Sequence, residues 1–103
     1  MWAQLIKMDV KPEHVADLPT LFGHLQQAEQ PDSGLLRTSV FQDRSDPTQA
    51  FVVVLFESEA KARIREQDPR RKEALKSVQE FMTDVLAGPP SFVDLDVIQD
   101  VTT

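Results

Sequence analysis

Few side chains in this sequence could carry out acid–base or metal chemistry. Cysteine, tyrosine and asparagine are absent, and the two histidines are His14 and His24. These histidines lie about 80° apart around a predicted helix, without carboxylates at ligand spacing, so no metal site is expected. His14 flanks the apolar stripe of that helix and is the one candidate for a catalytic acid–base group. The alternative is that both histidines are solvated surface residues.

A run of basic residues is the second candidate feature. Residues 61–76 carry seven basic and three acidic groups, although the whole chain has a net charge of −6. Arg70, Arg71 and Lys72 fall in the first turn of a predicted helix, where positive charge opposes the helix dipole. Such a cluster could bind a carboxylated or phenolate ligand at the mouth of a cleft. The favoured alternative is ion pairing with acidic residues nearby, because charge runs are usually solvated faces.

The composition disfavours several other classes of function. An acidic chain repels nucleic acids, so no nucleic-acid partner is expected. No apolar run approaches the roughly 18 residues that a membrane helix needs, and the N-terminus lacks a signal-peptide pattern. There is no glycine-rich phosphate loop and no serine-nucleophile motif. We therefore expect a cytoplasmic protein without a membrane partner.

The order of predicted elements fits one domain over residues 1–103. A helix begins at Pro12, with Pro19 predicting either a kink or a late start. The second helical region is predicted to contain two consecutive helices, a short one and then the main helix, which begins after Asp68. The predicted strands are residues 2–8, 35–42, 49–56 and 92–99, and the second region of helix spans residues 58–87. This βαββαβ order predicts an α+β ferredoxin-like fold, a four-stranded antiparallel sheet with both helices on one face.

The strand Phe51–Phe56 is apolar on both of its faces. The helices can cover only one face of the sheet, so the other face needs a partner. A second copy of the chain is the simplest candidate, and we expect a homodimer. The alternative is a monomer with an unusually apolar exposed sheet.

Three segments carry a resemblance to a known superfamily. They are the hairpin that runs from Gly34-Leu35-Leu36-Arg37 to residues 43–48, the strand-to-helix junction 55–60, and the step Gln67-Asp68-Pro69 into a helix. With these segments the chain resembles the dimeric α/β-barrel superfamily, and within it the antibiotic-biosynthesis-monooxygenase-like proteins. The resemblance implies two facing sheets that close a barrel and a cleft between helices and sheet in each subunit. It implies cofactor-independent oxygenation of an aromatic substrate or, in another branch, haem degradation.

The resemblance also suggests site residues. A polar residue on the first strand orients substrate or oxygen in the family, and Gln4 is the nearest amide here. Phe56 stands where a tryptophan is common. Leu75 stands where the haem-degrading branch has its iron-binding histidine, so no haem and no other cofactor is expected.

The predicted site is therefore small and mostly apolar. Gln4 is nominated for orientation, His14 for proton removal and Arg65 for stabilising an anion. The ligand-binding residues predicted for a small apolar or anionic ligand are Gln4, Phe22, Phe56, Arg65 and Leu75. Two alternatives stay open, a dimer that binds a ligand without catalysis and a structural dimer whose cleft is filled by its own side chains.

Overall fold

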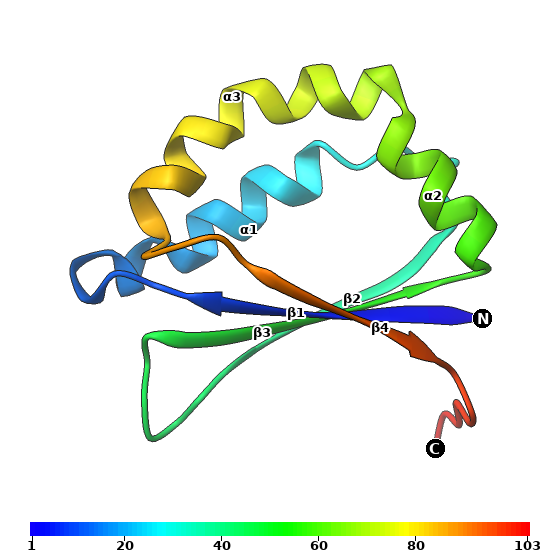
Figure 1. The fold of residues 1–103 in the computed structure, drawn as a ribbon, viewed down its shortest axis with the longest axis horizontal. Coiled ribbons are helices and arrows are strands. Elements are labelled where there is room, and N and C mark those ends of the chain that lie inside the picture. The colour runs from blue at the N-terminus through cyan, green and yellow to red at the C-terminus, as the bar shows by residue number, and fades with distance from the viewer.

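The computed structural model describes residues 1–103 and consists of one antiparallel sheet with helices on one of its faces (Figure 1). The predicted α+β ferredoxin-like fold is confirmed. The elements in chain order are β1 (Trp2–Asp9), the 3-10 helix η1 (Pro12–Asp17), α1 (Leu18–Gln27), β2 (Leu35–Gln42), β3 (Gln49–Phe56), α2 (Glu59–Gln67), α3 (Pro69–Val85) and β4 (Ser91–Asp96).

The strand order is β2-β3-β1-β4, so the two middle strands are the most apolar ones. The predicted bounds of the second and third strands are confirmed. The last strand is shorter than predicted, because it ends at Asp96 rather than at Gln99. Asp96 pairs with Trp2, the first residue of β1, so residues beyond it have no neighbouring strand to bond with.

Side-chain caps and prolines set the starts of the helices. The Ser58 hydroxyl accepts a hydrogen bond from the Lys61 backbone N–H at 3.2 Å, and Asp68 accepts one from the Arg70 N–H at 2.9 Å. Pro19 lies in the first turn of α1, which follows η1. Of the two alternatives predicted for this proline, a late start of the α-helix is therefore the one that the structure shows. None of the helices is both long enough and apolar enough to span a membrane.

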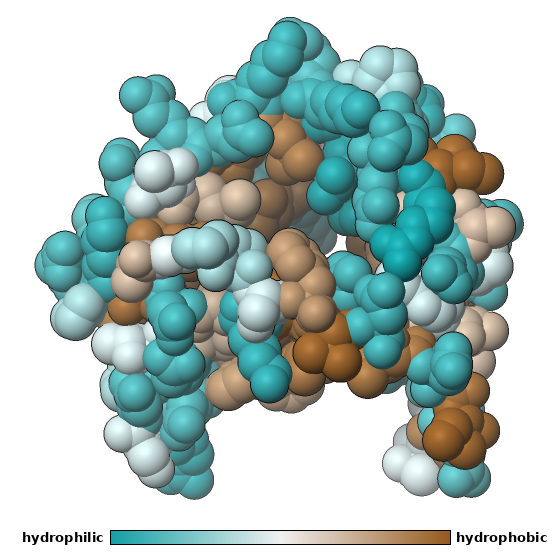
Figure 2. Space-filling model, viewed as in Figure 1, coloured by the Kyte–Doolittle hydropathy of each residue, from teal (hydrophilic) through white to brown (hydrophobic).

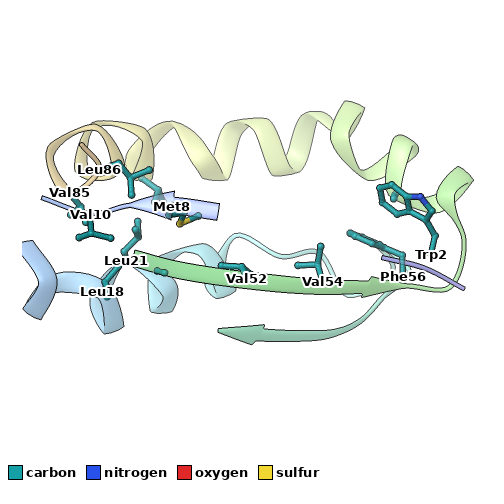
Figure 3. Close-up of a cluster of buried hydrophobic side chains, with 13 residues drawn as sticks. Trp2, Met8, Val10, Leu18, Leu21, Val52, Val54, Phe56, Val85 and Leu86 are labelled. Atoms are coloured by element: carbon teal, nitrogen blue, oxygen red, sulfur yellow. The ribbon is translucent and has the colours of Figure 1, made fainter. Parts of the chain in front are cut away.

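The core lies between the sheet and the helices (Figure 3). In β3 the buried residues are Ala50, Val52, Val54 and Phe56, which alternate with half-buried ones. Figure 3 shows the larger side chains gathered at two ends of the cluster, around Leu21 and Val85 at one end and around Trp2 and Phe56 at the other. The middle of the layer is lined by the smaller valines of β3.

The face of the sheet without helices, called the open face below, is mostly apolar. The strand register places Leu5 opposite Val53 there, with Leu55 and Val93 as neighbours. Val93 and Leu95 of β4 and Phe41 of β2 are exposed on this face, and the β3 residues are half-buried. No other part of the chain covers this surface (Figure 1). The two apolar faces of β3 thus have different surroundings, with one side in the core and the other on the open face.

Candidate functional site

A hollow of about 710 Å3 opens between α3 and the turn that leads into β4. It is lined by Lys76, Gln79, Glu80, Met82, Thr83, Leu86, Gly88, Pro89 and Pro90. Figure 2 shows the surface hollowed beneath α3, with apolar side chains visible between polar ones. A second hollow of about 500 Å3 lies where α2 meets α3, beside Arg63 and Asp68.

The helix side of β4, the strand that follows this turn, is poorly covered. All six residues of β4 are exposed. Phe92 points toward the helix side, because it pairs with Ile6, yet it is 57% exposed. Helix α3 packs against α1, α2 and η1. We call the hollow, together with this uncovered strand surface, the α3 cleft, and an accessible aromatic residue within it suits an apolar ligand.

A polar cluster lies on the floor of the α3 cleft, at the end next to α2. Gln4 of β1 donates a hydrogen bond from Nε2 to Asp94 Oδ1 at 3.0 Å. The other carboxylate oxygen of Asp94 accepts a hydrogen bond from Arg63 Nη2, also at 3.0 Å. The Arg63 guanidinium lies 5.0 Å from the centre of the Trp2 ring, within cation–π distance. Strands β1 and β4 and helix α2 thus meet at one charged contact.

The contacts of Asp94 fix its ionisation. The hydrogen bond from Gln4 and the hydrogen bond and charge of Arg63 outweigh the effect of desolvation, so the pKa of Asp94 lies below its ordinary value. Asp94 is therefore a carboxylate at neutral pH and a weak base. Its role in the cleft is to hold the Gln4 amide in one orientation.

This contact predicts how Gln4 responds to acid. We expect the side-chain amide signals of Gln4 in NMR spectra to move on acidification with a midpoint below the ordinary carboxyl value of 3.8, as Asp94 takes up a proton. The Asp94→Asn variant is the control, because it has no carboxylate at this position and should show no transition. A transition at or above 3.8 would contradict the contact.

A second charged pair lies beside Phe56, between α2 and the end of α1. Arg65 donates to both carboxylate oxygens of Glu29, at 2.9 and 3.1 Å from Nε and 2.7 Å from Nη2. The two side chains are only 17% and 20% exposed. Burial disfavours ionisation of Glu29, but hydrogen bonds from Arg65 and Ser33 and the charges of Arg65 and Arg71 outweigh it. The pKa of Glu29 therefore lies below its ordinary value.

Most of the basic run is neutralised within the chain. Five of its seven members form ion pairs, namely Lys61, Arg63, Arg65, Arg70 and Lys76. Lys72 instead donates a hydrogen bond to Gln67. The ion-pairing interpretation of this run is thus confirmed for its majority. The remaining residue, Arg71, is half-buried, and burial together with the nearby charge of Arg65 lowers its pKa.

The sequence-predicted site residues lie in different parts of the molecule. Gln4 is on the cleft floor, and Arg65 lies over the Phe56 ring and is occupied by Glu29. Phe56 is buried in the core against Trp2, with ring centres 5.9 Å apart. Phe22 of α1 and Leu75 of α3 are half-buried. None of these five residues lines either of the two hollows.

The histidines lie away from the polar cluster. His14 is in η1, where its Nδ1 is 2.8 Å from Asp17 Oδ2, and η1 and α2 lie at opposite ends of the helical layer (Figure 1). His24 stacks edge-on against Phe81 of α3, with ring centres 5.8 Å apart. Within the whole chain no three histidine, aspartate or glutamate side chains lie close enough together to hold a metal ion.

Sequence reasoning missed the partners that build the polar cluster. Arg63 belongs to the basic run, for which ion pairing on a solvated face is the favoured prediction, and nothing in the sequence pairs Asp94 with it. The alternation of charged and apolar residues in the last strand indicated that Asp94 and Val93 face opposite sides. Only the strand register, which pairs Asp94 with Gln4, places that carboxylate in the cleft.

Comparisons with known proteins identify the fold and the family. Among similar solved structures, an antibiotic biosynthesis monooxygenase assigned in Bordetella bronchiseptica has a TM-score of 0.75 at 17% identity, over 95% of this chain and 97% of that one. One assigned in Nitrosomonas europaea has a TM-score of 0.73 at 16% identity, over 96% and 100%. A mutant of MhuD with two manganese protoporphyrin IX molecules per active site has a TM-score of 0.80 at 18% identity, with both chains covered completely.

The sequence comparisons point in the same direction. No protein of curated function matches the chain. The model of the antibiotic biosynthesis monooxygenase family matches residues 1–77, about three quarters of the sequence, and includes β1, β2, β3 and the polar residues of α2. The resemblance predicted from the hairpin and the helix starts is confirmed, and the chain belongs to the antibiotic biosynthesis monooxygenase family.

Proposed function

We propose that this protein is a homodimeric, cofactor-independent monooxygenase that binds a small aromatic substrate in the α3 cleft. The observation that carries the proposal is the uncovered helix side of β4, where an exposed Phe92 lies on the same face of the sheet as the oriented Gln4 amide of β1. The apolar side chain provides area for an aromatic ring, and the amide provides a directional hydrogen bond. Membership of the family supports the reaction class.

The reaction converts an acidic methylene group next to an aromatic system into a carbonyl group. One oxygen atom of dioxygen enters the substrate and the other leaves as water with the two hydrogens of the methylene group, so the substrate supplies all four electrons that reduce dioxygen. The residues of this chain bind and orient. The Oε1 atom of Gln4 is free to accept a hydrogen bond from a substrate hydroxyl, because Nε2 is the atom that contacts Asp94.

Substrates that lose a proton without help fit this cleft best. His14, the base nominated from the sequence, lies at the other end of the helical layer and is bonded to Asp17, so we assign it no step. Asp94 is held as a carboxylate by Gln4 and Arg63. A phenolic or enolic substrate that ionises near neutral pH avoids the need for a base.

Oxygen uptake with an anthrone as substrate tests this proposal. We expect uptake above the rate of autoxidation in buffer, and a loss of roughly tenfold to a hundredfold in the Gln4→Leu variant, because substrate orientation is lost. The matched control is Gln26→Leu, which changes an exposed glutamine of α1. Uptake by the wild-type protein at the autoxidation rate would exclude the monooxygenase and leave the alternative below.

The alternative function is ligand binding without catalysis. The observation that favours it is the distance of both histidines from the polar cluster, which leaves the cleft with an amide and paired charges but no base. In this case an anthrone would bind to the cleft without consuming oxygen.

Haem does not fit the residues of the cleft. The structurally similar MhuD is described with manganese protoporphyrin IX bound. Here Leu75 stands where the related haem-degrading enzymes have a histidine, and His24 is engaged against Phe81 on α3. His14 is engaged with Asp17 in η1. We therefore derive no step through an iron centre.

The homodimer is the second part of the proposal. The strand register supports the homodimer, because it places Leu5, Val53 and Val93 side by side on the open face, across three strands. A second copy that presents the same surface would bury these residues, and a two-fold axis makes such a patch self-complementary.

A further inference from the structure

We propose that Arg71 is the anion-binding residue of this protein and that it binds the carboxylate of a ligand whose apolar part lies along α3. The proposal deepens the function above and rests on it in one respect, because the ligand is taken to occupy the α3 cleft. The expected ligands are small aromatic or aliphatic monocarboxylates and not neutral ring systems.

Arg71 is the one member of the basic run without a partner in the chain. It makes no side-chain hydrogen bond and no ion pair, whereas its neighbours Arg70 and Lys72 contact Asp68 and Gln67. It is also half-buried, unlike those two exposed residues. A guanidinium stays protonated in the physiological range, so the partial burial of Arg71 carries a desolvation cost, although none of its nitrogen atoms is fully buried without a partner. An acceptor from outside the chain would offset this cost.

The acidic groups near Arg71 are already engaged. Glu29 receives three hydrogen bonds from Arg65 through both of its carboxylate oxygens. Glu66 is bonded to Arg63 at 3.0 Å. Arg65 itself lies close enough to repel Arg71. The Arg65–Glu29–Arg71 group therefore retains one net positive charge, in a chain whose total charge is −6.

A carboxylate fits the donors that remain. Arg71 offers its whole guanidinium, whose planar fork matches the two oxygens of a carboxylate. Arg65 uses Nε and Nη2 for Glu29, so its Nη1 has no acceptor in the chain. The bound anion would also relieve the repulsion between the two arginines, which the charges of Glu29 and Glu66 offset only in part.

The face of α3 that begins at Arg71 continues with apolar residues. Leu75 follows at the fourth position and Val78 at the seventh, so the three residues share one side of the helix. Leu75 is half-buried and Val78 is buried in the core cluster. Met82 continues this side and borders the 710 Å3 hollow. A ligand with its charge at Arg71 would place an apolar body against the half-buried Leu75 and Met82, because Val78 is already covered by the core.

The test compares two probes that differ only in charge. Naphthoate and the neutral naphthalenemethanol are titrated into the full-length protein by calorimetry, with Arg71→Gln and Lys72→Gln as variants. Both variants remove one positive charge from adjacent positions of the same turn. We expect Arg71→Gln to weaken naphthoate binding by about tenfold or more, because a charge-assisted hydrogen bond is lost. Binding of naphthalenemethanol should not change, and Lys72→Gln should bind both probes like the wild type.

The outcomes separate this proposal from the proposed function. Equal affinity of the wild-type protein for the two probes, or equal losses in both variants, would overturn the anion subsite and leave the cleft intact. Failure of both probes to bind would overturn the ligand-binding cleft and the subsite together. Thermal unfolding gives a second readout, since Arg71→Gln removes a repulsive charge and should not lower the melting temperature. A lower melting temperature would show that Arg71 serves the fold instead.

Discussion

The Val53→Asp variant is expected to be a monomer at concentrations where the wild-type protein is a dimer. Val53 lies on the open face in the second strand of the sheet, with Leu5 opposite it on β1 and Ser39 opposite it on β2. An aspartate at this position would place an unpaired carboxylate in the middle of an apolar interface. Taking a charge out of water without a partner costs several kcal/mol, more than one subunit contact can offset.

The expected change is large enough for a simple measurement. A cost of roughly 4 kcal/mol raises the dimer dissociation constant about a thousandfold, which sedimentation equilibrium can detect. The control is Val40→Asp, the same substitution on the neighbouring strand β2. Val40 pairs with Val52 on the opposite side of the sheet and is 43% exposed. Dissociation in Val40→Asp and not in Val53→Asp would place the interface elsewhere, and a monomeric wild-type protein would remove the dimer.

The sequence predicted the sheet well because the sheet is specified by local patterns. The apolar run of β3 and the turn residues before it determine a hairpin, and the bounds of β2 and β3 follow from it. The caps at Ser58 and Asp68 act within three residues of their own positions. The end of β4 depends instead on where β1 begins, so the apolar residues Val97 and Ile98 suggested strand where no neighbour exists.

The site was harder to predict because its contacts join distant parts of the chain. Gln4 and Asp94 are separated by ninety positions, and Arg65 and Glu29 by thirty-six. Composition and spacing identified Gln4 and Arg65 as the polar groups of interest, yet they could not show which acids hold them. They also gave no means to distinguish Arg71 from Arg70, because both residues lie in the same turn and only one is paired.

The strongest single contribution to the stability of the helical layer is expected from Arg65. Its pair with Glu29 joins α2 to the end of α1, and its guanidinium lies 5.2 Å from the centre of the Phe56 ring. Arg65→Ala would leave Glu29 mostly buried without its main donor. Breaking a buried pair in this way typically costs 3–5 kcal/mol, but Arg71 lies near enough to replace part of the lost charge. We therefore expect a loss of about 2–3 kcal/mol in the free energy of unfolding.

The pH dependence of this loss tests its cause. The pKa of Glu29 is lowered in the folded state, so its stabilising contribution is complete above its ordinary value of 4.5 and disappears as the pH falls through the lower folded value. The difference between the wild-type protein and Arg65→Ala should therefore be largest near neutral pH and shrink on acidification, as Glu29 takes up a proton first in the variant and then in the wild-type protein. Chemical unfolding at several pH values measures it. A difference that stays constant into acid would assign the loss to the contact between the Arg65 guanidinium and the Phe56 ring.

Two further variants separate a buried pair from a surface one. Lys76→Ala breaks the pair with Glu73, whose members are 71% and 75% exposed, and should cost at most about 0.5 kcal/mol. The double variant Arg65→Ala/Glu29→Gln removes the uncompensated carboxylate and should recover part of the stability lost in Arg65→Ala alone. If the double variant were less stable by the sum of the single losses, the two residues would act independently. The association of α1 with α2 would then depend on apolar contacts rather than on this ion pair.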